Sequence, residues 1–106
     1  MYANIDKIKE QLQGISNSAD AELNSIQNDI TLEIDRRLSI ITDLPITDQT
    51  IREELAVFEA RLVALWFKHR RAGMQERESI MKEIEHTWQE FDRFIANRFG
   101  YGVVIG

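Results

Sequence analysis

The sequence contains no cysteine, one proline and five glycines among its 106 residues. Without cysteine, the chain can form no disulfide, no thiolate zinc site and no cysteine nucleophile. Proline and glycine interrupt regular elements, and their scarcity favours long helices over a turn-rich β fold. No apolar run approaches the ~20 residues of a membrane-spanning helix. Charged side chains within residues 1–10 lead us to expect no export signal there.

The charge balance is acidic, with a formal net charge of -5. Proteins that bind nucleic acid through its phosphates usually carry a net positive charge. An acidic surface can still suit a DNA channel, because it lets DNA pass without sticking. The hydrophobic fraction of 43% and the length of 106 residues suit one domain with a modest core.

Apolar residues recur at three- and four-residue steps along most of the chain, which is the pattern of amphipathic helices. The pattern predicts a short helix over residues 4–14. It predicts a second helix that begins with Ser18 as N-cap and ends before Pro45. The apolar stripe of this second helix consists of Leu23, Ile26, Ile30, Ile34, Leu38 and Ile41.

A third helix is predicted to begin at Thr50, because Thr50 and Glu53 have the spacing of a capping box. It ends near Arg71, with Gly73 as its expected C-cap. This helix is apolar on most sides, which is typical of a central helix packed on several neighbours. A fourth helix over residues 74–98 is about 40 Å long at ~1.5 Å per residue, and we expect part of it to project beyond the core. The expected fold is all-α, a four-helix bundle-like domain over residues 1–98 with a long C-terminal helix.

Residues 99–106 form an expected second unit, a short extended C-terminal docking tail. Glycines flank a β-prone apolar triplet that cannot continue the helix and is too short to form a sheet by itself. One interpretation is that the tail adds a strand to a partner's sheet, where backbone hydrogen bonds supply affinity. The other is a disordered or back-folded chain end. The candidate partner-binding residues are Phe99, Tyr101, Val103, Val104 and Ile105.

Other polar clusters fit structural roles better than chemistry. The basic residues 68–71 suit the C-terminal end of a helix dipole better than a phosphate site. Glu83 and His86 have the spacing of a di-iron ligand pair, but a second such motif is missing and both residues flank or oppose the apolar face. No carboxylate pair can be assigned to a cleft, and no glycine-rich loop has the order of a phosphate site. We therefore expect no catalytic residue, metal site, cofactor or enzyme activity.

Large aromatic side chains fall at helical spacing in the third and fourth helices, where such residues are usually part of the core. The number of large aromatic residues in these two helices is high for a chain of this length, and some of them are candidates for subunit contacts. The set consists of Trp66, Phe67, Trp88, Phe91, Phe94 and Phe99.

Several segments together resemble the head-tail connector adaptors of tailed phages. One is residues 34–38, which read Ile-Asp-Arg-Arg-Leu, and another is the dipeptide Leu44-Pro45 that follows in a loop. The next is a very apolar helix that closes with residues 65–70, Leu-Trp-Phe-Lys-His-Arg. The resemblance covers about residues 19–71, half of the chain.

The resemblance implies a structural adaptor of the virus neck, a helical subunit that forms a ring beneath the portal protein ring, with twelve copies expected. The ring would extend the DNA channel without binding DNA specifically, bind the next neck or tail component, and dock on the portal through a terminal segment. Its expected location is the virion neck, and the host cytoplasm before assembly, without contact to a membrane.

Two other functions remain open at this point. One is a small cytosolic helical interaction or regulatory module that oligomerises through its apolar third and fourth helices. The other is a di-iron or haem-binding bundle, which would carry bound metal or show visible absorbance.

Overall fold

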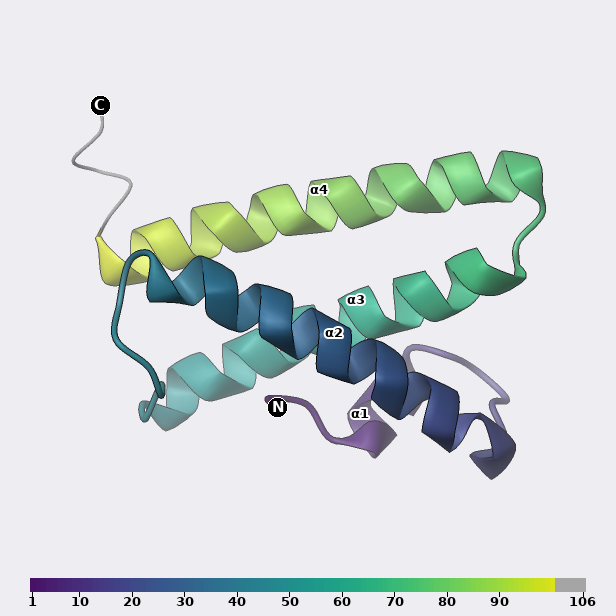
Figure 1. Cartoon of the computed structure of the whole chain (residues 1–106), viewed down its shortest axis with the longest axis horizontal. Coiled ribbons are helices and arrows are strands. Elements are labelled where there is room, and N and C mark those ends of the chain that lie inside the picture. The colour runs from purple at the N-terminus through teal and green to yellow at the C-terminus, as the bar shows by residue number, and fades with distance from the viewer. Residues whose placement is uncertain (101–106) are drawn as a thin grey trace.

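The structure, a computed structural model, describes residues 1–100 and is built of helices (Figure 1). Among these residues there is no strand, and the expectation of an all-α, bundle-like domain is confirmed. The elements in chain order are α1 (Ile5–Glu10), the short 3-10 helix η1 (Asn17–Ala19), α2 (Asp20–Ser39), α3 (Gln49–Arg71) and α4 (Met74–Phe99).

Helix α3 is the centre of the fold, as its apolar sequence predicted. It packs against α1, α2 and α4, while α2 and α4 diverge from one another along it (Figure 1). Removing these apolar side chains from water, at roughly 25 cal/mol per Å² of apolar surface, is the main force that holds the helices together. The most deeply buried members of the core are Ile8 of α1, Leu23, Ile34 and Leu38 of α2, Leu55, Leu62 and Val63 of α3, and Ile84 and Phe91 of α4.

The first turns of α2 and α3 begin differently from the prediction. Helix α3 is capped by Asp48, whose side chain accepts a hydrogen bond from the backbone N–H of Ile51 at 3.1 Å. The predicted cap, Thr50, is already inside the helix, so the capping-box prediction was wrong. Ser18 is likewise not the N-cap of α2, because it lies within η1 with its hydroxyl 2.6 Å from that of Ser16. At α3 the neighbouring Asp48 is an equally suitable cap, whereas the N-cap position of α2 is Ala19 and no side chain caps that helix.

Glycines mark both ends of α4. Gly73 has a φ of -72° and precedes α4 as its N-cap, while Ala72 ends α3, so the prediction of Gly73 as a C-cap of α3 was wrong. Gly100 has a φ of 70°, in the left-handed region that favours glycine, and ends α4. Phe99 is the last helical residue and packs against the core, so it belongs to α4 and not to an extended tail.

The described part of the molecule is flat, and α4 runs along its length (Figure 1). The Cα extents are 42 × 29 × 18 Å. The first turns of α4 are exposed, and Met74 is 84% exposed, so this end of the helix projects beyond the core as expected. Within residues 1–100, no helix combines the length and the apolar character that crossing a bilayer demands.

Candidate functional site

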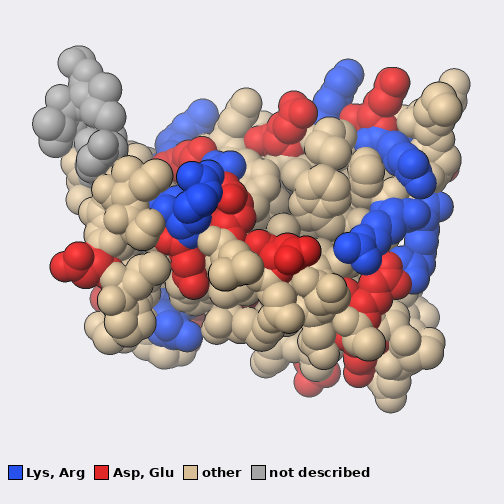
Figure 2. Space-filling model, viewed as in Figure 1, with Lys and Arg blue, Asp and Glu red and all other residues tan. Residues whose placement is uncertain are grey.

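An open groove of about 420 Å³ lies where α2 and α4 diverge over α3. We call it the α2–α4 groove. Figure 2 shows uncharged surface between these two helices, bordered by acidic and basic side chains. The groove is lined by Ile26, Asp29, Ile30 and Glu33 of α2, by Trp66, His69 and Arg70 of α3, and by Trp88 of α4.

Both tryptophans of the chain line this groove. Trp66 and Trp88 are half-buried and pack against the core, and part of each side chain remains open to the groove. The ring of His69 lies 5.2 Å from that of Trp66, and the ring of Phe91 supports Trp88 edge-on at 5.4 Å. Open aromatic surface beside polar groups is characteristic of protein interfaces. The groove is therefore a surface that suits a partner segment.

Arg37 closes one end of the groove by joining α2 to α4. Its Nη1 donates to both carboxylate oxygens of Asp92, at 2.8 and 2.7 Å, and its guanidinium carbon lies 4.2 Å from the centre of the Trp88 ring. Its Nε donates to Glu33 at 2.7 Å. Positions 26, 30, 33 and 37 follow three- and four-residue steps and so share one side of α2. That side is apolar at the open end of the groove and charged at the closed end.

The α2 wall carries negative charge at the rim. Hydrogen bonds from Arg36, together with those from Arg37, lower the pKa of Glu33 to about 2. Asp29, one turn earlier, is exposed, and no ion pair among residues 1–100 involves it. Arg70 supplies a positive charge on the α3 side. The groove thus combines an apolar floor with a rim that can bond to the polar groups of an occupant.

A second polar site lies inside the fold, where Glu59 holds the N-terminal segment. The Glu59 side chain is fully buried, and its Oε2 accepts hydrogen bonds from the backbone N–H groups of Tyr2 and Ala3 at 2.7 and 2.6 Å. Its Oε1 accepts from the hydroxyl of Thr31, and the side chain of Gln27 donates to the carbonyl of Ala3 at 2.6 Å. All these partners belong to the chain itself. The site therefore fastens the first residues to α2 and α3 and has a structural role.

Tyr2 extends this anchor towards the surface. Its hydroxyl donates to Asp35 at 2.5 Å, and burial together with this hydrogen bond raises the pKa of the phenol. The apolar pattern of the third helix did not indicate the anchor, because Glu59 stands among the apolar residues of that helix. The available signal was a carboxylate at core spacing, four residues after Leu55 and three before Leu62, since a buried charge needs partners.

The polar clusters singled out in the sequence take part in local contacts. Glu83 and His86 are exposed, and His86 Nε2 lies 2.7 Å from Glu90 on the same helix. In the part of the chain that the structure describes, no three His, Cys, Asp or Glu side chains gather as metal ligands would. From the basic residues 68–71, Arg71 pairs with Glu22 at 2.7 Å. These contacts fit the structural interpretation of both clusters.

The predicted partner-binding residues are not brought together by the described structure. Phe99 packs against the core at the end of α4, about three turns away from Trp88. The other four candidates lie outside the described residues: Tyr101, Val103, Val104 and Ile105. The groove itself was missed, because its width depends on the angle between α2 and α4, which no local pattern encodes.

The chain matches no protein-family model, and comparisons with curated proteins and with solved structures return no match. The resemblance to head-tail connector adaptors therefore stays a prediction.

Proposed function

We propose that the chain is a structural adaptor of a tailed virus neck, a subunit of a ring that joins the portal to the tail and extends the DNA channel. The observation that carries the proposal is the open α2–α4 groove. Two long helices lie on α3 without closing over it, and they leave both tryptophans partly uncovered. A partner segment that filled the groove would remove this surface from water, as in helix-lined protein interfaces.

The order of the elements supports the proposal. Residues 34–38 lie at the end of α2, and the Leu44–Pro45 dipeptide lies in the loop that leads to α3. Helix α3 is the central helix, and its basic end faces α2 through the pair formed by Arg71 and Glu22. These segments, on which the resemblance depends, thus form one continuous helix–loop–helix unit around the core.

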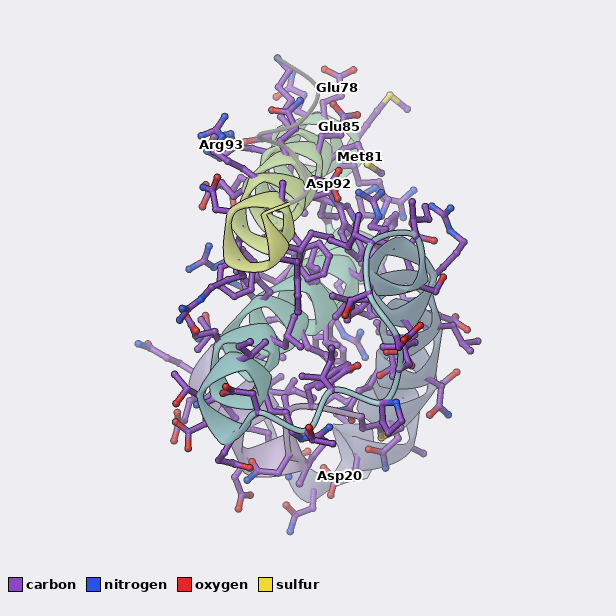
Figure 3. All side chains as sticks on the ribbon, turned by 90° about the vertical axis from the view of Figure 1, so that its left-hand side faces the viewer. Asp20, Glu78, Met81, Glu85, Asp92 and Arg93 are labelled. Atoms are coloured by element: carbon purple, nitrogen blue, oxygen red, sulfur yellow. The ribbon has the colours of Figure 1, made fainter. Side chains whose placement is uncertain are left out.

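The charge on α4 suits the wall of a DNA channel. Glu78 and Glu85 lie seven residues apart and therefore on the same side of the helix, with Met81 between them (Figure 3). The exposed Lys82 also lies on this side, four residues after Glu78 and three before Glu85, so one positive charge stands between the two carboxylates. Asp92 continues this line but pairs with Arg37, while Arg93 lies on another side (Figure 3). A ring that presented Glu78 and Glu85 to its lumen would repel the phosphates of passing DNA.

Capture from virus-producing cells tests the proposal. A tagged full-length chain is expressed during infection, and the proteins that bind to it are identified by mass spectrometry. The proposal predicts recovery of a ring-forming portal protein and of a second neck or tail component. Recovery of no virion component, from cells in which the chain is abundant and folded, would contradict the proposal. A stable small oligomer of the chain alone would then favour the helical interaction module.

A further inference from the structure

Arginine side chains lie over aromatic rings at several places in this protein. At four of these places the same guanidinium also forms an ion pair with a carboxylate, because its planar group can stack on a ring while its N–H groups bond to an acid. The four sets are Arg37 with Trp88 and Asp92, Arg61 with Phe58 and Glu90, Arg71 with Phe67 and Glu22, and Arg98 with Phe94 and Glu54. An aromatic ring beside a carboxylate is thus a combination that this chain repeatedly pairs with a guanidinium.

The α2–α4 groove contains the same combination without the guanidinium. Trp66 and Asp29 line the groove together. Among residues 1–100, no cation–π contact involves Trp66 and no ion pair involves Asp29. Arg70 also lines the groove, but its ion pair is with Glu22, at 3.5 Å. The groove therefore suits a guanidinium that comes from elsewhere.

Within residues 1–100, one arginine has no contact that would occupy its guanidinium. Arg93 on α4 is exposed, and it takes part in no side-chain hydrogen bond, ion pair or cation–π contact with the described residues. The carboxylate three residues earlier, Glu90, contacts His86 at 2.7 Å instead. Every other arginine contacts a carboxylate, a backbone carbonyl or an aromatic ring. The described chain thus presents a free guanidinium on α4 and a fitting ring and carboxylate in the groove.

Arg93 cannot fill the groove of its own copy. Successive residues of an α-helix turn by about 100°, so Arg93 lies about 140° around α4 from Trp88, which lines the groove. Figure 3 shows Arg93 on a different side of α4 from Asp92, which bonds to Arg37 at the closed end of the groove. Trp88 and Arg93 also lie on opposite sides of Glu85, at about 60° and 80° from it. In a ring with Glu85 facing the channel, the groove and Arg93 would therefore point towards different neighbours.

We propose that Arg93 of one copy binds against Trp66 and Asp29 in the α2–α4 groove of a neighbouring copy. This inference deepens the proposed ring and rests on it. The guanidinium lies over the Trp66 ring and donates to the Asp29 carboxylate, in the way that Arg37 does with its own ring and carboxylate inside the chain. The two surfaces differ, so the contact is heterologous, and it repeats from copy to copy until the ring closes.

Charge reversal in separately prepared full-length chains tests the inference. Arg93→Glu and Asp29→Arg each bring like charges together in the proposed contact, whereas a mixture of the two variants brings opposite charges together again. The control is Lys82→Glu, which reverses another exposed positive charge of α4, about three turns from Arg93. Sedimentation velocity at low salt measures the dissociation constant of self-association, and circular dichroism verifies that each variant is folded.

The natural chain is expected to self-associate with a dissociation constant below about 1 mM. Each of Arg93→Glu and Asp29→Arg alone should associate at least about tenfold more weakly, because like charges repel across the contact. The mixture should recover most of the lost affinity, and Lys82→Glu should associate as the natural chain does. A natural chain that stays monomeric at about 1 mM, an equal loss in Lys82→Glu, or a mixture that associates no more tightly than its components would overturn the inference.

The same measurements separate this inference from the proposed function. Unchanged self-association of Arg93→Glu and Asp29→Arg, together with capture of a portal protein by the natural chain, would refute the contact and leave the neck adaptor standing. Recovered association in the mixture, without capture of any virion component, would support self-assembly through the groove and refute the neck adaptor.

Discussion

The guanidinium of Arg37 lies 4.2 Å from the centre of the Trp88 ring and connects two helices that otherwise rest on α3. Asp92 of α4 and Glu33 of α2 both accept hydrogen bonds from the same guanidinium. The contact closes one end of the α2–α4 groove and leaves the other end open. It therefore joins the two walls of the groove at that end.

Replacing Arg37 by alanine should destabilise the fold and widen the groove. The loss combines a cation–π contact of about 0.5–1 kcal/mol with ion pairs of about 0.2–1 kcal/mol, for a total of about 1–2 kcal/mol. Urea unfolding, followed by circular dichroism, measures the change in the free energy of unfolding. Arg36→Ala is the matched control, because among residues 1–100 Arg36 forms ion pairs with Glu33 but with no residue of α4. Equal effects of the two substitutions would show that the link between helices adds nothing.

Stability should fall in acid through Glu33. The pKa of this group in the folded protein is about 2, below its ordinary value of 4.5, so its charged form stabilises the fold. The contribution is fully present above pH 4.5 and is lost as the pH falls towards 2. Because solvent screens the ion pairs of Glu33 with Arg36 and Arg37, this contribution to the free energy of unfolding is about 1 kcal/mol or less. Between pH 6 and pH 2, the free energy of unfolding should change less with pH in Glu33→Gln than in the natural chain. An equal change in the two proteins would contradict the role of this carboxylate.

The Glu59 anchor should be among the most sensitive polar positions in the chain. Glu59→Ala leaves the N–H groups of Tyr2 and Ala3 and the hydroxyl of Thr31 without their partner, at roughly 1–3 kcal/mol for each buried unsatisfied group. We expect a loss of at least about 3 kcal/mol and rapid hydrogen exchange at Ala3.

The matched control for this anchor is Glu53→Ala, on an exposed side of the same helix. It should change the free energy of unfolding by less than about 0.5 kcal/mol. A Glu59→Ala protein that unfolds at the same urea concentration as this control, with slow exchange at Ala3, would refute the anchor.

Charge reversal on α4 tests the acidic lumen. Glu78→Lys combined with Glu85→Lys places positive charges on the side of α4 that we assign to the channel, where DNA phosphates would bind to them. Genome packaging and ejection should slow, and raising the salt concentration should partly restore both because the added contacts are electrostatic. Glu53→Lys, on α3, is the control. Unaffected packaging and ejection in the double variant would remove the support for an acidic lumen.

The sequence predicted the helices well because their apolar stripes are long and regular. Positions 23, 26, 30, 34 and 38 of α2 are buried as predicted, and α4 departs from its predicted range by one residue. Ile41, the last member of the predicted stripe, lies beyond the end of α2 and is only half-buried. Helix starts were less predictable, since Asp48 and Thr50 are both good caps and the difference between them depends on a single hydrogen bond. The groove could not be predicted, because it arises from how α2 and α4 cross α3. The Glu59 anchor had a sequence signal in a carboxylate at core spacing, but its partners in the N-terminal segment and α2 depend on how these elements meet α3. The neighbours of residues such as Trp88 and Glu59 depend on how these elements pack together in three dimensions.

Electron cryomicroscopy of the chain bound to its captured portal protein tests the neck-adaptor proposal most directly. The account predicts a closed ring of copies that is coaxial with the portal, with α4 facing the channel. A complex in which single copies bind the portal without contacting one another, or a ring in which α4 faces away from the channel, would contradict it.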